Sequence, residues 1–183
     1  TGNSIKSKSG TPLEVFSDLE IRNTLGSRFI IPGKIEAEDF ESMSGLAVEE
    51  TTDEGGGKNL GYTDSGDFAD YLIFSHEESK YIVDFRLASE WAIGEIGLYL
   101  ISDDSVETEL VRIETPVTGG WQTWTTVKAN VYLPKGIHKL RMKILDGGFN
   151  INWIDFELDA SIDNDIDNDN VIDSEDDCLD TRE

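Results

Sequence analysis

Hydrophobic and polar residues alternate along several segments between residues 31 and 158. Successive side chains of a β-strand point to opposite sides, so a period of two is typical of a strand with one buried face. The alternation is clear over residues 81–87, 96–101, 127–133 and 139–144. We therefore expect these four segments to be strands that each bury one face.

Turn-forming residues separate the alternating segments and indicate the fold class. Glycines or a Pro-Lys-Gly triplet occur at positions 55–57, 94, 119–120, 134–136 and 147–148. Between them, no helical stretch is long enough to connect parallel strands. The spacing predicts an all-β protein, an antiparallel β-sandwich of about eight to ten strands in two sheets.

The same pattern divides the chain into three parts. Residues 1–30 are polar with modest apolar content, and we expect a linker or N-terminal extension there. Residues 31–158 form the predicted sandwich. Residues 159–183 change abruptly to Asp and Asn and form a separate acidic segment. The chain begins without Met or an apolar signal sequence, so we expect it to be a piece of a longer protein.

Charge limits the classes of partner. The chain carries a net charge of −23, and residues 159–183 contribute 11 acidic groups and one basic group to it. Such a surface repels phosphate backbones and anionic lipid, so neither nucleic acid nor a membrane is an expected partner. Sulfated and uronate-rich glycans are disfavoured for the same reason. Neutral ligands and cations remain.

Residues typical of catalysis are scarce. His76 and His138 are the two histidines, and both have neighbours typical of structural histidines. No serine nucleophile elbow, phosphate loop or zinc-ligand spacing occurs. Carboxylates are abundant, but nothing singles out a glycosidase pair. We therefore expect that this chain is not an enzyme.

Two aromatic residues lie in turns, where a ring can be exposed. Trp121 follows two glycines, and Tyr62 follows Gly61. A flat aromatic ring matches the apolar face of a pyranose, while hydroxyl groups at the sugar's edge form hydrogen bonds. Two facing rings could therefore hold one sugar. Considered alone, each ring fits a place in the core at least as well.

Four segments, taken together, resemble family 6 carbohydrate-binding modules. They are residues 35–40, 61–71, 119–124 and 147–156, and they follow the order of the family's motifs. The resemblance implies a β-jelly-roll sandwich appended to a secreted polysaccharide-degrading enzyme. It also implies a ligand site in the loops at one end, which places the protein outside the cell and covalently linked to a catalytic domain.

The resemblance also assigns residues to this site. Tyr62 and Trp121 match the two clasping aromatics, and Asn150 matches the asparagine that hydrogen-bonds the sugar. Glu49, on the acidic approach at 49–54, would rim the cleft and select among sugars.

Some members of the family also bind glycan on a concave sheet face. Trp91 and Tyr99 are our candidates for that second surface, and a structural role is the alternative for both.

A structural Ca²⁺ is the implied cofactor. Glu36 and Glu38 lie at i and i+2, on one face of a strand, and Asp155 belongs to the last strand. Calcium prefers several hard oxygen ligands, and a bound ion would relieve the repulsion among these carboxylates. A solvated acidic edge is the alternative.

The acidic tail contains a second pattern of possible calcium ligands. A twelve-residue loop that starts at residue 165 would offer five carboxylates, from Asp165, Asp167, Asp169, Asp173 and Asp176. The segment resembles a thrombospondin type 3 calcium repeat. It departs from that pattern in having Asn170 at the usual glycine position and Asp at the twelfth. A disordered acidic linker is the alternative.

These patterns together predict a non-catalytic module that binds a polysaccharide or oligosaccharide. A neutral glycan is expected: either agarose or a β-1,3-glucan such as laminarin, with xylan and cellulose behind them. Chain ends are preferred, because a clasp encloses a whole sugar. The alternative is a calcium-stiffened structural or adhesion domain of a multidomain cell-surface protein.

Overall fold

The computed structural model describes residues 28–159, which contain twelve strands. The first sheet has the order β1 (Phe29–Ile31), β6 (Phe68–Ser75), β11 (Gly136–Asp146), β8 (Glu95–Ile101) and β9 (Glu107–Glu114), with β3 (Ser42–Ser44) paired to β6. The second has the order β10 (Thr125–Leu133), β7 (Ser79–Ala88), β12 (Asn150–Leu158), β5 (Lys58–Gly61) and β4 (Ala47–Glu50), with β2 (Gly33–Glu36) paired to β12. Within residues 28–159 there is no helix that could cross a bilayer.

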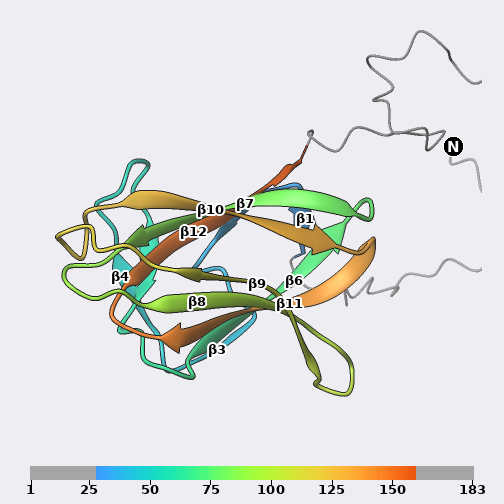
Figure 1. Ribbon diagram of the computed structural model, residues 1–183, viewed down its shortest axis with the longest axis horizontal. Coiled ribbons are helices and arrows are strands. Elements are labelled where there is room, and N and C mark those ends of the chain that lie inside the picture. Colours follow the sequence, from blue (N-terminus) through green and yellow to red (C-terminus); the bar gives the residue numbers. More distant parts are fainter. Residues whose placement is uncertain (1–27, 160–183) are drawn as a thin grey trace, which may run out of the picture.

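The two sheets pack face to face, as Figure 1 shows. All strand pairs are antiparallel except β1 with β6. The predicted antiparallel β-sandwich is confirmed.

The core lies between the sheets and follows the predicted alternation. In β7 every second residue from Tyr81 to Leu87 is fully buried, and in β11 the same holds from Leu140 to Ile144. Fully burying one such side chain stabilises the fold by roughly 1.5–3 kcal/mol relative to leaving it exposed. The hydrophobic period of two therefore located these strands correctly.

The strand count exceeds the expected eight to ten because the first quarter of the fold is built from short strands. The five strands β1 to β5 have only three or four residues each. Alternation over so few positions is too brief to detect. The first strand begins at Phe29, just before the boundary expected at residue 31.

Four loops converge at one end of the sandwich, where the site lies (Figure 1). The pairing register explains this convergence. Asn150, at the start of β12, pairs with Ala88 at the end of β7, and Thr125 of β10 pairs with Leu87. In the first sheet, Phe68 and Glu95 start β6 and β8 beside the end of β11. The loops β5–β6, β7–β8, β9–β10 and β11–β12 are therefore neighbours.

Candidate functional site

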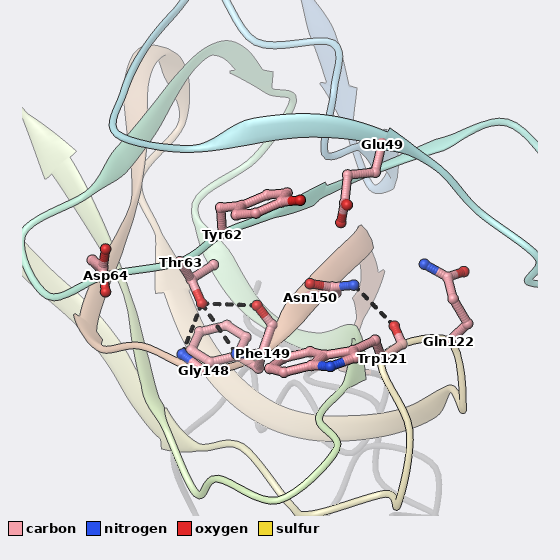
Figure 2. A pocket seen from close by; sticks show the side chains of 9 residues that line it. All are labelled: Glu49, Tyr62, Thr63, Asp64, Trp121, Gln122, Gly148, Phe149 and Asn150. Atoms are coloured by element: carbon pink, nitrogen blue, oxygen red, sulfur yellow. Dashed lines mark hydrogen bonds between the residues drawn. The ribbon is translucent and has the colours of Figure 1, made fainter.

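A cavity of about 520 Å³ opens at the end where the loops converge (Figure 2). The residues that line it come from four parts of the chain and are Glu49, Tyr62, Thr63, Asp64, Trp121, Gln122, Gly148, Phe149 and Asn150. Glu49 belongs to β4 and Asn150 begins β12, while the others lie in loops. Segments as far apart in sequence as Glu49 and Asn150 therefore form one site.

The two aromatic rings predicted to bind sugar lie on opposite walls of the cavity. Figure 2 shows Tyr62 on one side, Trp121 on the other, and Asn150 between them. Tyr62 is 72% exposed and Trp121 is 37% exposed, so neither ring belongs to the core. The structure thus brings together the three residues that the sequence singled out.

Tyr62 has an uncommon backbone conformation. Its φ of 56° lies in the left-handed region, which non-glycine residues rarely adopt. Such a conformation costs roughly 1–3 kcal/mol and occurs preferentially at binding and catalytic sites. The chain turns here directly after Gly61 ends β5, and the ring of Tyr62 is left exposed at the cavity.

Thr63 fastens the Tyr62 loop to the loop that precedes Asn150. Its side-chain oxygen donates to the carbonyl of Phe149 at 2.8 Å and accepts from the backbone N–H groups of Gly148 and Phe149, at 3.0 and 3.1 Å. Gly148 N–H also approaches the carbonyl of Thr63 at 3.1 Å. Since Thr63 is buried, these bonds fix the distance between two walls of the cavity.

Hydrogen-bond acceptors occupy the centre of the cavity. Asn150 Nδ2 donates to the carbonyl of Trp121 at 2.9 Å, while no group within residues 28–159 donates a hydrogen bond to its Oδ1. A methyl group on Gly61 would lie 2.3 Å from Glu49 Oε2 and 2.8 Å from Asn150 Oδ1, so only glycine allows both oxygens to approach this point. Figure 2 shows the Glu49 carboxylate pointing toward Asn150. A ligand must therefore bring hydroxyl or N–H donors.

Gln122 bonds the Trp121 loop to the β4–β5 loop and to β5. Its Oε1 accepts from the backbone N–H of Thr52 at 2.8 Å and from Trp124 Nε1 at 3.3 Å, and its Nε2 donates to Asn59 Oδ1 at 3.1 Å. Sequence reasoning missed both Gln122 and Thr63. Each follows a predicted aromatic residue directly, but apart from the Trp124 bond to Gln122 the partners named here are 63 to 86 positions away, and no local pattern reveals them.

Trp91 lies elsewhere than predicted. It belongs to the β7–β8 loop rather than to a sheet face, and it is 69% exposed. Its ring packs edge-to-face against Trp121, with 5.2 Å between centroids and 79° between planes. The short stretch between Ser89 and Gly94 had no strand pattern from which its direction could be inferred.

Tyr99 does lie on a strand, β8, but its ring is only 7% exposed. Its hydroxyl donates to Glu109 Oε2 at 2.9 Å, and Lys143 Nζ lies 5.5 Å from the ring centroid. Burial raises the pKa of Tyr99, and the bond to Glu109 raises it further. The predicted open platform at Tyr99 is therefore covered by its neighbours.

The three candidate calcium ligands differ in their surroundings. Glu36 forms an ion pair with Lys34 at 2.6 Å, and Asp155 lies opposite Lys34 in the backbone register of β12 with β2. Glu38 accepts a hydrogen bond from the backbone N–H of Lys58 at 3.2 Å, while its Oε2 is buried with no partner among residues 28–159. Burial raises the pKa of both Glu38 and Asp155.

An orphaned, buried carboxylate oxygen fits a cation, and Glu38 provides one. Side chains alone do not complete a metal site around Glu38. In the described part of the chain, no group of three or more acidic, His or Cys residues could hold a metal ion. The tail candidates Asp165, Asp167, Asp169, Asp173 and Asp176 lie outside the described residues.

An antiparallel sandwich with an aromatic-walled cavity in its end loops is the architecture of a carbohydrate-binding module. The family profile described as carbohydrate binding module (family 6) matches residues 36–158, which is more than half of the chain. The chain belongs to this family, whose members are non-catalytic binding modules.

Solved structures of the same family are similar over most of their length. A module of lichenase 5A from Cellvibrio mixtus, in complex with cellotriose, is 37% identical with a TM-score of 0.64, over 69% of this chain and 96% of that one. A β-1,3-glucan-binding module from Bacillus halodurans is 31% identical with a TM-score of 0.65, over 72% of this chain and 99% of that one.

A curated relative is much longer. The clotting factor G alpha subunit of Tachypleus tridentatus is 36% identical over 121 residues, which are 66% of this chain and 18% of that protein. The chain thus spans less than a fifth of this relative.

Proposed function

We propose that this module binds a neutral glycan, β-1,3-glucan or agarose, by holding one sugar between Tyr62 and Trp121. The observation that carries the proposal is the open cavity with exposed rings on opposite walls and acceptor oxygens between them. The likeness to a β-1,3-glucan-binding module and to a module solved with cellotriose supports a glucan as ligand.

The charge of the site favours a neutral ligand. Glu49 and Asp64 are the ionisable acids that line the cavity, and none of the nine lining residues is basic. A uronate or sulfate group would enter an acidic cavity on a chain of net charge −23 without a cation to pair with. Sugar hydroxyls, in contrast, can donate to Glu49 and to Asn150 Oδ1.

The two opposed rings favour a chain end. A mid-chain sugar continues into the polymer on both sides, whereas a terminal sugar needs an exit on one side alone. We therefore propose that the module prefers terminal residues of its glycan.

The proposal also covers where the module acts and which domain is linked to it. We propose an extracellular module, covalently linked to a polysaccharide-degrading catalytic domain, that raises the local concentration of that domain at its substrate. The sequence resemblance supports this setting. A Ca²⁺ bound at the Glu38 carboxylate would stabilise the fold away from the cavity.

Equilibrium titration with neutral and acidic oligosaccharides tests the proposal. Laminari- or agaro-oligosaccharides should bind with a Kd in the micromolar to millimolar range, about −4 to −8 kcal/mol, and oligoglucuronates should bind far more weakly. Trp121→Ala should abolish measurable binding, because the cavity loses one wall.

The matched control is Tyr132→Ala, which removes an exposed ring from β10, at the opposite end from the loops. This variant should bind like the wild type. Unchanged affinity in Trp121→Ala would contradict the proposal, and release of reducing sugar by the chain would contradict the non-catalytic assignment.

A further inference from the structure

Trp121 is held by hydrogen bonds at its backbone, whereas its indole ring relies on packing. The carbonyl of Trp121 accepts a hydrogen bond from Asn150 Nδ2 at 2.9 Å, and the next residue, Gln122, is bonded to the β4–β5 loop and to β5. Within residues 28–159, however, the indole N–H of Trp121 donates no hydrogen bond. Rotation of the ring about its two side-chain torsion angles is therefore limited by its packing partners.

Trp91, from the neighbouring β7–β8 loop, supplies such a partner. Its ring lies 5.2 Å from the Trp121 ring between centroids, with 79° between the planes, which is the edge-to-face geometry that aromatic pairs prefer. Trp91 does not line the cavity, whereas Trp121 does. The contact therefore reaches the cavity wall from outside the space that a sugar would occupy.

Hydrogen bonds of the buried Ser89 hold the loop that carries Trp91. The carbonyl of Ser89 accepts from the N–H groups of Thr118 and Gly119, at 2.8 and 3.0 Å, and its own N–H donates to Thr118 Oγ1 at 2.9 Å. Its Oγ donates to the carbonyls of Ala92 at 2.6 Å and Gly148 at 2.9 Å. One buried residue thus joins the β7–β8 loop to the two neighbouring loops.

The other end of the Trp91 segment is fixed at Gly94. The N–H of Gly94 donates to Thr115 Oγ1 at 2.8 Å, and its carbonyl accepts from the N–H of Thr115 at 2.9 Å. A methyl group on Gly94 would lie 2.5 Å from the ring of Phe149 and 2.8 Å from the carbonyl oxygen of Gly147, so the chain passes tightly against the β11–β12 loop here. Because the segment is bonded at both ends, it can hold the ring of Trp91 against its neighbour.

We propose that Trp91 is a positioning residue, which holds the indole of Trp121 in the orientation that faces Tyr62. This role rests on the proposed function, because it concerns the ring that would stack on the sugar. A ring that already has its bound orientation loses little freedom on binding, whereas a freely rotating ring must be immobilised when the sugar stacks on it. Trp91 thus contributes to affinity without contacting the sugar.

¹⁵N relaxation of the Trp121 indole N–H in the ligand-free protein tests the contact directly. In the wild type its order parameter should equal that of a rigid backbone, about 0.85, and in Trp91→Ala it should fall below about 0.6. Trp91→Phe, which retains an aromatic ring, should restore most of the rigidity. Ile93→Ala is the matched control, because it removes an exposed apolar side chain from the same loop and should leave the order parameter unchanged.

Titration with glucose and laminaritriose measures the consequence for binding. Trp91→Ala should weaken the binding of both ligands by the same factor, roughly three- to tenfold, as expected when one more side chain is immobilised on binding. Trp91→Phe should recover most of the affinity, and Ile93→Ala should bind like the wild type. If Trp91 itself contacted a sugar, the loss would be confined to the longer ligand.

The outcomes separate this inference from the proposed function. A Trp121 indole that is equally rigid in the wild type and in Trp91→Ala would overturn the positioning role, whichever glycan the module binds. A loss of affinity confined to laminaritriose would also overturn it. If Trp121→Ala binds both ligands as the wild type does, the proposed function itself fails.

Discussion

Three consecutive residues, Gly61, Tyr62 and Thr63, determine most of the geometry of the site. Gly61 makes room for the oxygens of Glu49 and Asn150, Tyr62 adopts the left-handed conformation that leaves its ring exposed, and Thr63 bonds the opposite loop. The ring of Tyr62 is thus positioned by its two neighbours, and binding should depend on residues that never touch the sugar.

Thr63→Val tests this dependence. The substitution keeps the side-chain shape but removes the hydroxyl, which leaves the Gly148 and Phe149 N–H groups without that acceptor in a buried place. We expect a loss of about 1–3 kcal/mol in the free energy of unfolding and weaker glycan binding. Urea denaturation and titration measure the two effects. Thr63→Ser, which retains the hydroxyl, should restore both, and a fully stable Thr63→Val variant would contradict the assignment.

At the scale of elements, a partly buried ion pair between Arg86 and the buried Asp53 holds the β4–β5 loop to the second sheet. Arg86 of β7 donates to both carboxylate oxygens of Asp53, at 2.6 and 2.8 Å, and Asn152 of β12 donates to Asp53 at 2.8 Å. The hydrogen bonds from Arg86 hold the pKa of Asp53 below its usual range. The same loop supplies Thr52, which bonds Gln122, so the ion pair supports the Trp121 wall indirectly.

Asp53→Asn should therefore destabilise the fold in a pH-dependent way. Because the pKa of Asp53 is lower in the folded state, its contribution is present above the ordinary Asp pKa and is lost as pH falls through the folded value. We expect a loss of about 3 kcal/mol near pH 7, since an unpaired Arg86 remains, and a smaller difference from the wild type at about pH 3.

Urea denaturation at both pH values measures this difference. Asp84→Asn is the control, because its ion pair with the exposed Lys128 is screened by solvent and should contribute little to stability. Equal destabilisation by Asp53→Asn at both pH values would contradict the role assigned to its charge.

The strands and loops also show how far the sequence predicts the fold and the site. Long strands such as β7 and β11 were predictable because alternation repeats over residues 81–87 and 139–144, whereas β1 to β5 have only three or four residues each. Tyr62, Trp121 and Asn150 were predictable because each lies beside glycines within a family motif. Trp91 was misplaced and Thr63 was missed, because their positions depend on contacts between loops that are distant in sequence.

At the scale of the whole molecule, the high negative charge leads us to expect that a bound cation stabilises the fold. The chain carries −23, and Glu38 keeps a buried oxygen without a partner in the described part of the chain. A Ca²⁺ bound there would neutralise charge that burial disfavours.

Calcium should therefore raise the Tm of the protein. At a concentration about 100 times the Kd, binding to the folded state adds about 2.7 kcal/mol, which corresponds to roughly 5–10 °C for a domain of this size. Differential scanning calorimetry with calcium and with a chelator measures the shift. Glu38→Gln should abolish it, and a shift of the same size in this variant would show that the ion binds elsewhere.

The central claim is that one sugar lies between Tyr62 and Trp121. Its most direct measurement is an NMR titration of the ¹⁵N-labelled protein with laminaritriose, which reports on each amide and indole N–H group. The account predicts that the largest shifts occur at the Trp121 indole and at the backbone amides of residues 61–64 and 148–150. Shifts concentrated around Tyr99 and Lys143 on the first sheet, with the Trp121 indole unmoved at saturation, would contradict it.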